Sequence, residues 1–261
     1  MTMQQSTTID PAPLDVAGGS DIGCVRRENQ DAWLVDEPLK LAIVADGMGG
    51  GPAGALAAQT VVRRMAEIMR QVITSNHSKQ EVSRRRVARR LLRETVSSVS
   101  QEILNMSEDD LELKGMGATV VAAWHCGSAL HLAHQGDSRA YLFRDCLLRP
   151  LTADHSIVAL LVRNGEITEQ EALNHPARGQ LTRFVGMPGD VYCDVQTLKI
   201  EKGDRLLLCT DGLWGVVSDV EIATAFMEQA QTADVCNSLI KLAVLRGAPD
   251  NVTAVAWNLG L

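Results

Sequence analysis

The chain has 261 residues, of which 46% are hydrophobic, and its 25 basic and 32 acidic residues give a formal net charge of −7 at pH 7. This acidic balance argues against general nucleic-acid binding, which needs a basic face, and no apolar run reaches the roughly 18 residues of a membrane span. We therefore expect neither nucleic acid nor a membrane among its partners, and the surplus of carboxylates suits cation binding or plain solubility.

The cysteines and the N-terminus are typical of a cytoplasmic protein. Six cysteines are scattered without a C-x-x-C pair, so we interpret them as reduced side chains rather than as disulfides or zinc ligands. The first residues are polar and lack the charged start and apolar stretch of a secretory signal. We predict a short flexible tail over residues 1–18, followed by one domain over residues 19–261.

The first half of the domain combines a buried strand with two long helices. The run KLAIVA at 40–45 predicts a buried strand, and the glycines that follow Asp46 predict a loop. Helical spacing of apolar residues begins at Ala53, directly after a proline suited to a helix start. We predict helices over 53–73 and about 79–106. The second is rich in arginine, which we interpret as a solvated face, with docking of an acidic partner as the alternative.

The second half changes to strands and then returns to a helix pair. Apolar and polar residues alternate between turn residues, which predicts strands with turns at 127–128 and 145–146. Ser218 and Glu221 have the spacing of a helix N-cap pair and predict the start of a helix. Helices in pairs disfavour a doubly wound parallel sheet and favour antiparallel sheets with helices outside. The predicted segments are strands at 117–127, 128–137, 139–151, 191–200, 204–212 and 251–259, an irregular region with two short helices at 154–190, and helices at 218–227 and 231–246.

Aspartates stand at the ends of several predicted strands. One such aspartate is most simply a turn residue, but a half-buried carboxylate is costly unless it is paired or binds a metal. A set of five therefore predicts one shared pocket. Mg²⁺ and Mn²⁺ prefer oxygen ligands, and glycine after Asp46 allows a close backbone approach, so the Gly47 carbonyl is a further candidate ligand. The five are Asp31, Asp46, Asp137, Asp211 and Asp250.

Eight motifs in order resemble those of the metal-dependent protein phosphatases of the protein phosphatase 2C family, in their bacterial form. The resemblance implies an α+β fold, a four-layer sandwich of two antiparallel β-sheets flanked by helix pairs. The motifs are SDIGCVRRENQDAW (20–33), VADGMGGGPAG (44–54), GMGATVVAA (115–123), HQGDSRAYL (134–142), LTADHS (151–156), LTRFVGMPGD (181–190), GDRLLLCTDGLWGVVSDVEI (203–222) and PDNVTAV (249–255).

The resemblance also implies roles for the aspartates. Asp46 would bridge two core ions, Mn²⁺ or Mg²⁺, and Gly47 would give its carbonyl to one of them. Asp211 and Asp250 would complete the other site. Asp31 would hold metal-bound water as an outer carboxylate, so that Asp31, Asp46 and Asp211 form the catalytic set.

Two further roles follow from the same resemblance. Asp137 would join Asp211 at a third, weaker metal site found in bacterial members. Arg26 would bind the substrate phosphate, because its planar fork matches phosphate oxygens, whereas Arg27 is interpreted as a surface charge. The reaction would be direct attack by metal-bound hydroxide on phosphorus.

The chain departs from the family pattern at two positions. Met48 stands where many members have a histidine, and methionine cannot transfer a proton to the leaving group. Gln30 stands where some members have glutamate, which removes one outer negative charge. For His155 we expect a structural hydrogen bond rather than proton transfer.

Residues 156–190 correspond to the variable flap of the family. Three arginines in this region, Arg163, Arg178 and Arg183, could meet phosphopeptides or be ordinary surface charges.

The function implied is hydrolysis of phosphoserine and phosphothreonine in proteins. The partners would be phosphorylated proteins and a bacterial Ser/Thr kinase of eukaryotic type, in general signalling or in control of a secretion machine, and we expect a cytoplasmic monomer. The alternatives are a silent phosphoprotein-binding protein and an enzyme for small phosphorylated molecules. The presence of Asp46, Asp211 and Asp250 argues against the silent form.

Overall fold

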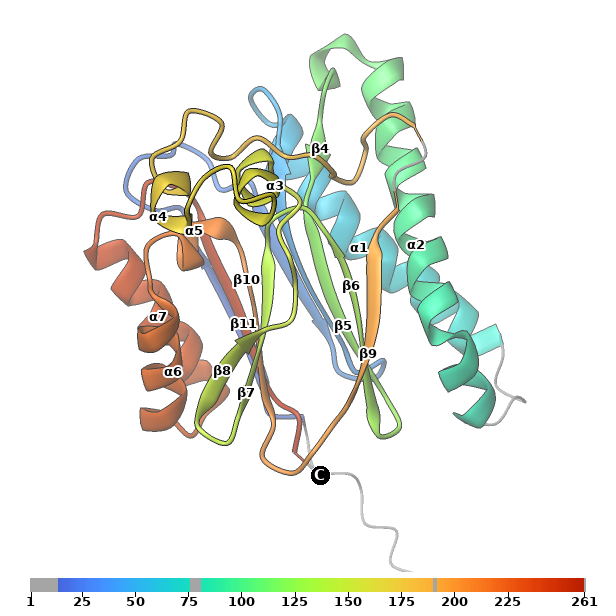
Figure 1. Ribbon diagram of the computed structural model, residues 1–261. Helices are drawn as coiled ribbons and strands as arrows, with labels where there is room; N and C mark the ends of the chain where they lie inside the picture. The colour runs from blue at the N-terminus through green and yellow to red at the C-terminus, as the bar shows by residue number, and fades with distance from the viewer. Residues whose placement is uncertain (1–13, 76–80, 190–191, 261) are drawn as a thin grey trace, which may run out of the picture.

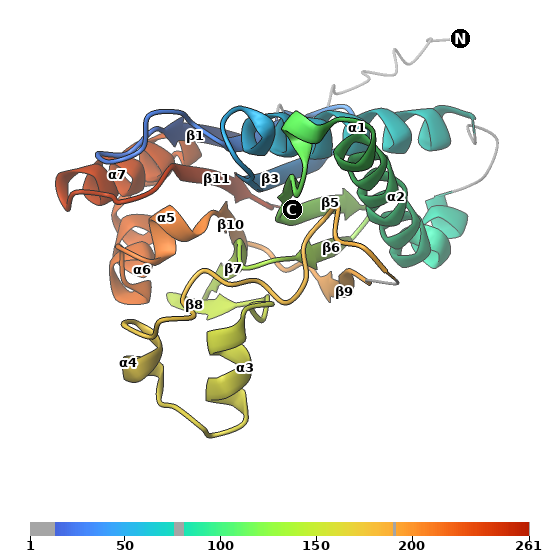
Figure 2. The same cartoon turned by 90° about the horizontal axis from the view of Figure 1, so that it is seen from above.

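The structure, a computed structural model, describes residues 14–75, 81–189 and 192–260. Two antiparallel sheets pack face to face, and helices cover their outer faces (Figures 1 and 2). The predicted α+β sandwich is confirmed.

The first sheet has five strands and begins with the two ends of the described chain side by side. Its order is β1-β11-β10-β7-β8. The strands are β1 (Val16–Asp21), β11 (Val252–Asn258), β10 (Arg205–Cys209), β7 (Arg139–Arg144) and β8 (Leu147–Pro150).

The second sheet has six strands in the order β2-β3-β5-β6-β9, with the short β4 paired to β3. Its strands are β2 (Asp31–Asp36), β3 (Leu41–Met48), β4 (Gly117–Ala118), β5 (Val120–Cys126), β6 (Ala129–Gln135) and β9 (Asp194–Lys199).

The central strands are apolar throughout because both of their faces are buried. Along β3, Ala42 and Val44 face the other sheet, whereas Leu41, Ile43 and Ala45 face the helices. Side chains alternate along a strand, so Asp46 continues the face between the sheets and lies at the end of that core.

Two helix pairs close the outer faces. The pair α1 (Ala53–Ser75) and α2 (Glu81–Asp109) packs on the six-stranded sheet, and α6 (Asp219–Glu228) with α7 (Thr232–Leu245) packs on the five-stranded sheet. The predicted paired helices are confirmed. Shorter elements are η1 (Leu111–Leu113), α3 (Ile157–Arg163), α4 (Glu169–Ala172) and α5 (Asp211–Trp214).

The predicted tail of residues 1–18 is wrong at its end, because β1 begins at Val16 and pairs with β11. The Gly18-Gly19 pair concealed this strand, since glycine has low strand propensity. The reason for glycine is contact: a Cβ at Gly18 would lie 2.6 Å from the Trp33 ring. Residues 1–13 lie outside the described residues.

The loop predicted after Asp46 also begins later than expected. The strand β3 continues through Gly47 and Met48, which pair with β4. The single turn of α5 was not predicted, because four residues carry no helical period.

Candidate functional site

The aspartates Asp31 and Asp46 lie directly opposite each other on β2 and β3. Asp46 is held through its backbone: its N–H donates to the Thr119 hydroxyl at 2.8 Å. Asp31 is held by the other sheet, since its Oδ2 accepts from the hydroxyls of Thr210 at 2.8 Å and Thr253 at 2.6 Å. These bonds join the two sheets at the end of the sandwich where the carboxylates stand.

The aspartates of the five-stranded sheet come from two loops in close contact. Asp211 follows β10 and starts α5, and Asp250 precedes β11. A Cβ at Gly212 would lie 1.9 Å from the Asn251 carbonyl oxygen, so only glycine allows this approach. The Asn251 side chain in turn accepts from the Gln30 N–H at 2.8 Å, which fixes the chain just before Asp31.

Asp137 lies two residues beyond the end of β6 and is buried. Its carbonyl accepts from the Trp214 indole N–H at 3.0 Å, and the Arg139 guanidinium lies 3.6 Å from the centre of the Trp214 ring. Arg139 also binds Asp154 through two nitrogens at 2.9 and 2.8 Å. The Asp137 carboxyl is therefore placed beside a charged pair without being part of it.

Burial and mutual repulsion raise the pKa values of these carboxyls. The pKa of Asp31 rises to about 7, that of Asp137 to about 8 and that of Asp211 to about 6, in each case mainly through burial. The pKa of Asp46 rises well above its ordinary value through burial and then through the charges of Asp31, Asp211, Asp137 and Asp250. The five predicted aspartates are thus within electrostatic reach of one another.

The donor set suits a hard divalent cation. The Oδ1 atoms of Asp31 and Asp211 are buried without a hydrogen-bond donor. Such oxygens, in a cluster of repelling carboxyls, are what a cation would satisfy. Across the described ranges, no group of three or more His, Cys, Asp or Glu side chains is arranged to hold a metal ion. The coordination shell of an ion bound at this site would therefore also need main-chain or water oxygens.

Gly47 lies at a crowded point of the backbone. A Cβ at this position would lie 1.9 Å from the Gly54 carbonyl oxygen and 2.7 Å from that of Gln30. Its N–H donates to the Gln30 carbonyl at 3.0 Å. The Gln30 amide donates to the Gly51 carbonyl at 2.7 Å, so this residue supports the glycine loop.

Arg26 lies at the rim of the carboxylate cluster. Its Nη2 is 2.6 Å from Asp250 Oδ2, and 53% of its side chain is exposed. The hydrogen bond to Asp250 raises the pKa of Arg26, and the charges of Asp46 and Asp211 add to this. For Arg27, no ion pair is found within the described part of the chain. Arg26 therefore contacts the carboxylate cluster, and the phosphate-binding role given to it stays a prediction.

The three flap arginines have different surroundings. Arg178 reaches the cluster: its charge lowers the pKa of Asp211, and its Nη2 lies 3.1 Å from where a Cβ at Gly215 would stand. Arg183 instead pairs with Asp194 at 3.0 Å, away from the cluster. For Arg163, no ion pair occurs among the residues described. Of these three arginines, Arg178 is the one whose charge acts on Asp211.

His155 makes the structural contacts expected of it. Its Nδ1 accepts from the Gly136 N–H at 3.1 Å, and its Nε2 is 3.2 Å from Asp194 Oδ2.

Met48, in β3, brings no titratable group. The sequence did not predict four residues that position the aspartates, namely Thr119, Thr210, Thr253 and Asn251. The last three adjoin or closely follow a predicted aspartate, so a hydroxyl or amide side chain next to such an aspartate could have indicated them.

Comparisons with known proteins show which family the chain resembles. The profile of the family described as Protein phosphatase 2C matches residues 26–243. The chain is 35% identical over 239 residues to the Serine/threonine phosphatase stp of Listeria monocytogenes, covering 90% of this chain and 92% of that protein. It is 37% identical over 246 residues to the Serine/threonine protein phosphatase PstP of Mycobacterium tuberculosis, covering 94% of this chain and 45% of that protein.

Solved structures show the same fold. The crystal structure of the Mycobacterium tuberculosis phosphatase PstP/Ppp superposes with a TM-score of 0.83 at 35% identity, covering 95% of this chain and all of that one (100%). The catalytic domain of PstP in complex with 2 manganese ions gives a TM-score of 0.81 at 34% identity, covering 94% and 98% of the two chains. This chain belongs to the protein phosphatase 2C family and is a serine/threonine phosphatase.

Proposed function

We propose that the carboxylate cluster hydrolyses phosphoserine and phosphothreonine in proteins with the help of Mn²⁺ or Mg²⁺. The observation that carries the proposal is the set of four carboxyls whose pKa values are raised, two of which have a buried oxygen without a donor. A divalent cation relieves both their repulsion and their missing bonds. The relative solved with 2 manganese ions supports the same chemistry.

The proposed ligands divide into two core sites and one weaker site. Asp46 would bridge the core ions, the Gly47 carbonyl would bind one, and Asp211 with Asp250 would bind the other. Asp137 lies close enough to Asp211 for their charges to interact, which supports a third, weaker site between them. When bound, such ions lower the pKa of water to near neutral and neutralise charge on the phosphoryl group.

The remaining steps belong to side chains of this chain. Arg26 would bind the phosphate oxygens and place phosphorus over the cluster. Asp31 would orient the attacking water through Oδ1, since Oδ2 is already occupied by two threonine hydroxyls. Attack by the water oxygen forms the new P–O bond while the bond to the serine or threonine oxygen breaks. Because Met48 has no proton to give, we propose that this leaving oxygen takes its proton from water.

The test is release of phosphate from a phosphothreonine peptide with Mn²⁺ and then with excess chelator. We expect turnover that chelator abolishes and added Mn²⁺ restores. Metal-independent turnover would overturn the proposed chemistry, and tight peptide binding without turnover would favour a silent binding protein. Free phosphoserine hydrolysed as efficiently as the peptide would favour a small-molecule enzyme.

The setting in the cell is also a proposal. We propose that the chain acts in the cytoplasm against a Ser/Thr kinase of eukaryotic type, and that it does so as a monomer, which light scattering would check. In the described ranges, no helix is long and apolar enough to cross a membrane.

A further inference from the structure

The strand β9 is the last strand of the six-stranded sheet and has β6 on one side only. In the register of this pair, Ser128 lies opposite Ile200, and the Ile200 N–H donates to the Ser128 carbonyl at 3.2 Å. Hydrogen-bonded pairs alternate along an antiparallel ladder, so every second residue of β9 turns its N–H and C=O away from β6. These residues are Val195, Thr197 and Lys199.

Two arginines already use this outer edge. The Val195 carbonyl accepts from Arg89 Nη2 at 3.0 Å, and the Lys199 carbonyl accepts from Arg144 Nη2 at 3.0 Å. Thr197 lies between them, and its outward main-chain groups have no partner within the described part of the chain. In both overall views no strand covers this edge (Figures 1 and 2). An edge of this kind can pair with another chain.

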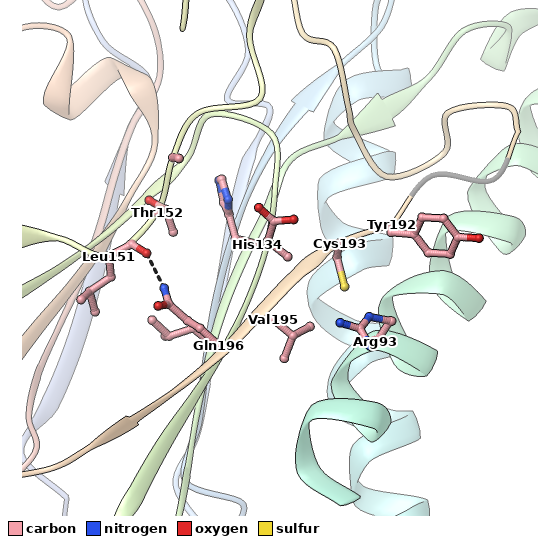
Figure 3. A pocket seen from close by; sticks show the side chains of 11 residues that line it. Arg93, His134, Leu151, Thr152, Tyr192, Cys193, Val195 and Gln196 are labelled. Carbon is pink, nitrogen blue, oxygen red and sulfur yellow. Dashed lines mark hydrogen bonds between the residues drawn. The ribbon is translucent and has the colours of Figure 1, made fainter. Parts of the chain in front are cut away.

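A cavity of about 630 Å³ runs beside the start of β9 (Figure 3). Cys193 and Val195 line it, and both side chains face the helices. Gln196 also lines it, and because side chains alternate along a strand it points to the opposite face of the sheet. A cavity that contacts both faces of one strand must lie along its edge. It therefore offers a place for side chains on either side of an added strand.

The two sides of the cavity differ in chemistry. On the helix side stands Arg93, for which no ion pair is found among the described residues. On the other side Leu132 and Leu151 provide an apolar wall. The Asp194 carboxylate is held by Arg183 at 3.0 Å and faces His155 Nε2 at 3.2 Å, so its charge is largely balanced. An added strand would be favoured by an acidic residue on one face and an aliphatic neighbour on the other.

We propose that the β9 edge docks an extended segment of the phosphoprotein substrate, outside the phosphorylated residue, in which acidic and aliphatic residues alternate. Main-chain bonds to Thr197 give the pairing, and Arg93 with the apolar wall selects the side chains. The edge begins where the flap ends, which places the docked segment beside the catalytic end of the sandwich (Figure 1). That the segment belongs to a substrate rests on the proposed function.

The test is binding of a fluorescein-labelled heptapeptide of alternating valine and glutamate, followed by fluorescence anisotropy. Thr197→Pro removes the outward N–H but no bond to β6, and we expect it to weaken binding by about tenfold or more. Thr197→Val is the matched control: it loses the hydroxyl bond to His131 but keeps the N–H, and should bind within about twofold of the natural chain. Arg93→Glu should weaken binding by about tenfold, unlike Arg90→Glu, whose side chain is 75% exposed and pairs with Glu94.

Several outcomes would overturn the docking site. They are absence of binding to the natural chain, equal binding by the two Thr197 variants, or equal binding of a peptide with lysine in place of glutamate. Hydrolysis of p-nitrophenyl phosphate reports the catalytic centre separately and should be unchanged in every variant. If Thr197→Pro loses this activity through misfolding, the Arg93→Glu comparison decides. Peptide binding without any hydrolysis would refute the proposed function and leave the edge as a binding site.

Discussion

Asp211 combines three features that bear on metal binding. It starts a helical turn, it has a buried Oδ1 without a donor, and it feels the charges of Asp250, Arg178 and Arg26. We expect Asp211→Asn to weaken Mn²⁺ binding by about 100-fold and to lower kcat at least as much, because one charged ligand becomes neutral. Isothermal titration with Mn²⁺ checks this, with the exposed Asp234→Asn as control. Unaltered Mn²⁺ affinity would remove Asp211 from the ligand set.

Arg26 and Arg27 form a natural pair of test and control. Arg26 lies against Asp250, whereas Arg27 is exposed. We expect Arg26→Ala to raise KM for a phosphothreonine peptide by about tenfold, more than it lowers kcat, because it removes a charged contact to phosphate. Steady-state kinetics measure both constants. If Arg27→Ala raised KM equally, general surface charge would explain the effect.

At the scale of residues, the aspartates were predictable because each lies near the end of a strand. The alternating pattern of the strand stops there, and in two cases a glycine follows the aspartate. The contacts of the flap arginines were not predictable, because their distance from Asp211 depends on the path of an irregular loop. Arg178 and Arg183 looked alike in the sequence, yet one interacts with Asp211 and the other with Asp194.

At the scale of elements, the turn between β7 and β8 carries local strain. Its two residues, Asp145 and Cys146, have φ angles of 53° and 58°, in the left-handed region that glycine adopts more easily. We expect Cys146→Gly to raise the free energy of unfolding by about 1 kcal/mol. Urea unfolding measures this, and Cys146→Ala, which keeps a Cβ, should leave stability nearly unchanged. A destabilised glycine variant would show that the thiol makes a needed contact.

Most elements were predictable for simple reasons, and the failures also have causes. Long helices such as α1 repeat apolar residues at helical spacing over many turns. The turn at Asp145 was predictable because aspartate is common in turns. The strand β1 was missed because its Gly18-Gly19 pair lacks the branched side chains of a strand. What holds it is pairing with β11, far away in the chain, which local pattern does not contain.

At the scale of the whole molecule, one buried histidine links stability to pH. Burial, with the nearby His155, lowers the pKa of His134 to about 3, whereas an unfolded histidine titrates near 6.5. Between these values only the unfolded chain binds the proton. The free energy of unfolding therefore falls as pH decreases below 6.5, by at most about 1.4 kcal/mol per pH unit from this group.

Replacing this histidine isolates its contribution. We expect the His134→Gln variant to lose less stability than the natural chain between pH 7 and pH 5, by about 1–2 kcal/mol. Urea unfolding at both pH values measures the difference, and the aspartates contribute equally to both proteins. Parallel pH dependence in the two proteins would mean that His134 is protonated in the folded state.

The pairing of β1 with β11 has a consequence for biosynthesis. The two strands lie side by side, yet more than 200 residues separate them in the chain, so β1 leaves the ribosome long before β11. The nascent β1 has no partner in its own sheet until β11 emerges, so the five-stranded sheet closes only after Asn258 has been synthesised, and contacts this distant in sequence form slowly. The six-stranded sheet, complete at Lys199, can assemble earlier. Ribosome-bound chains ending near residue 245 should therefore hold one formed sheet and one open one.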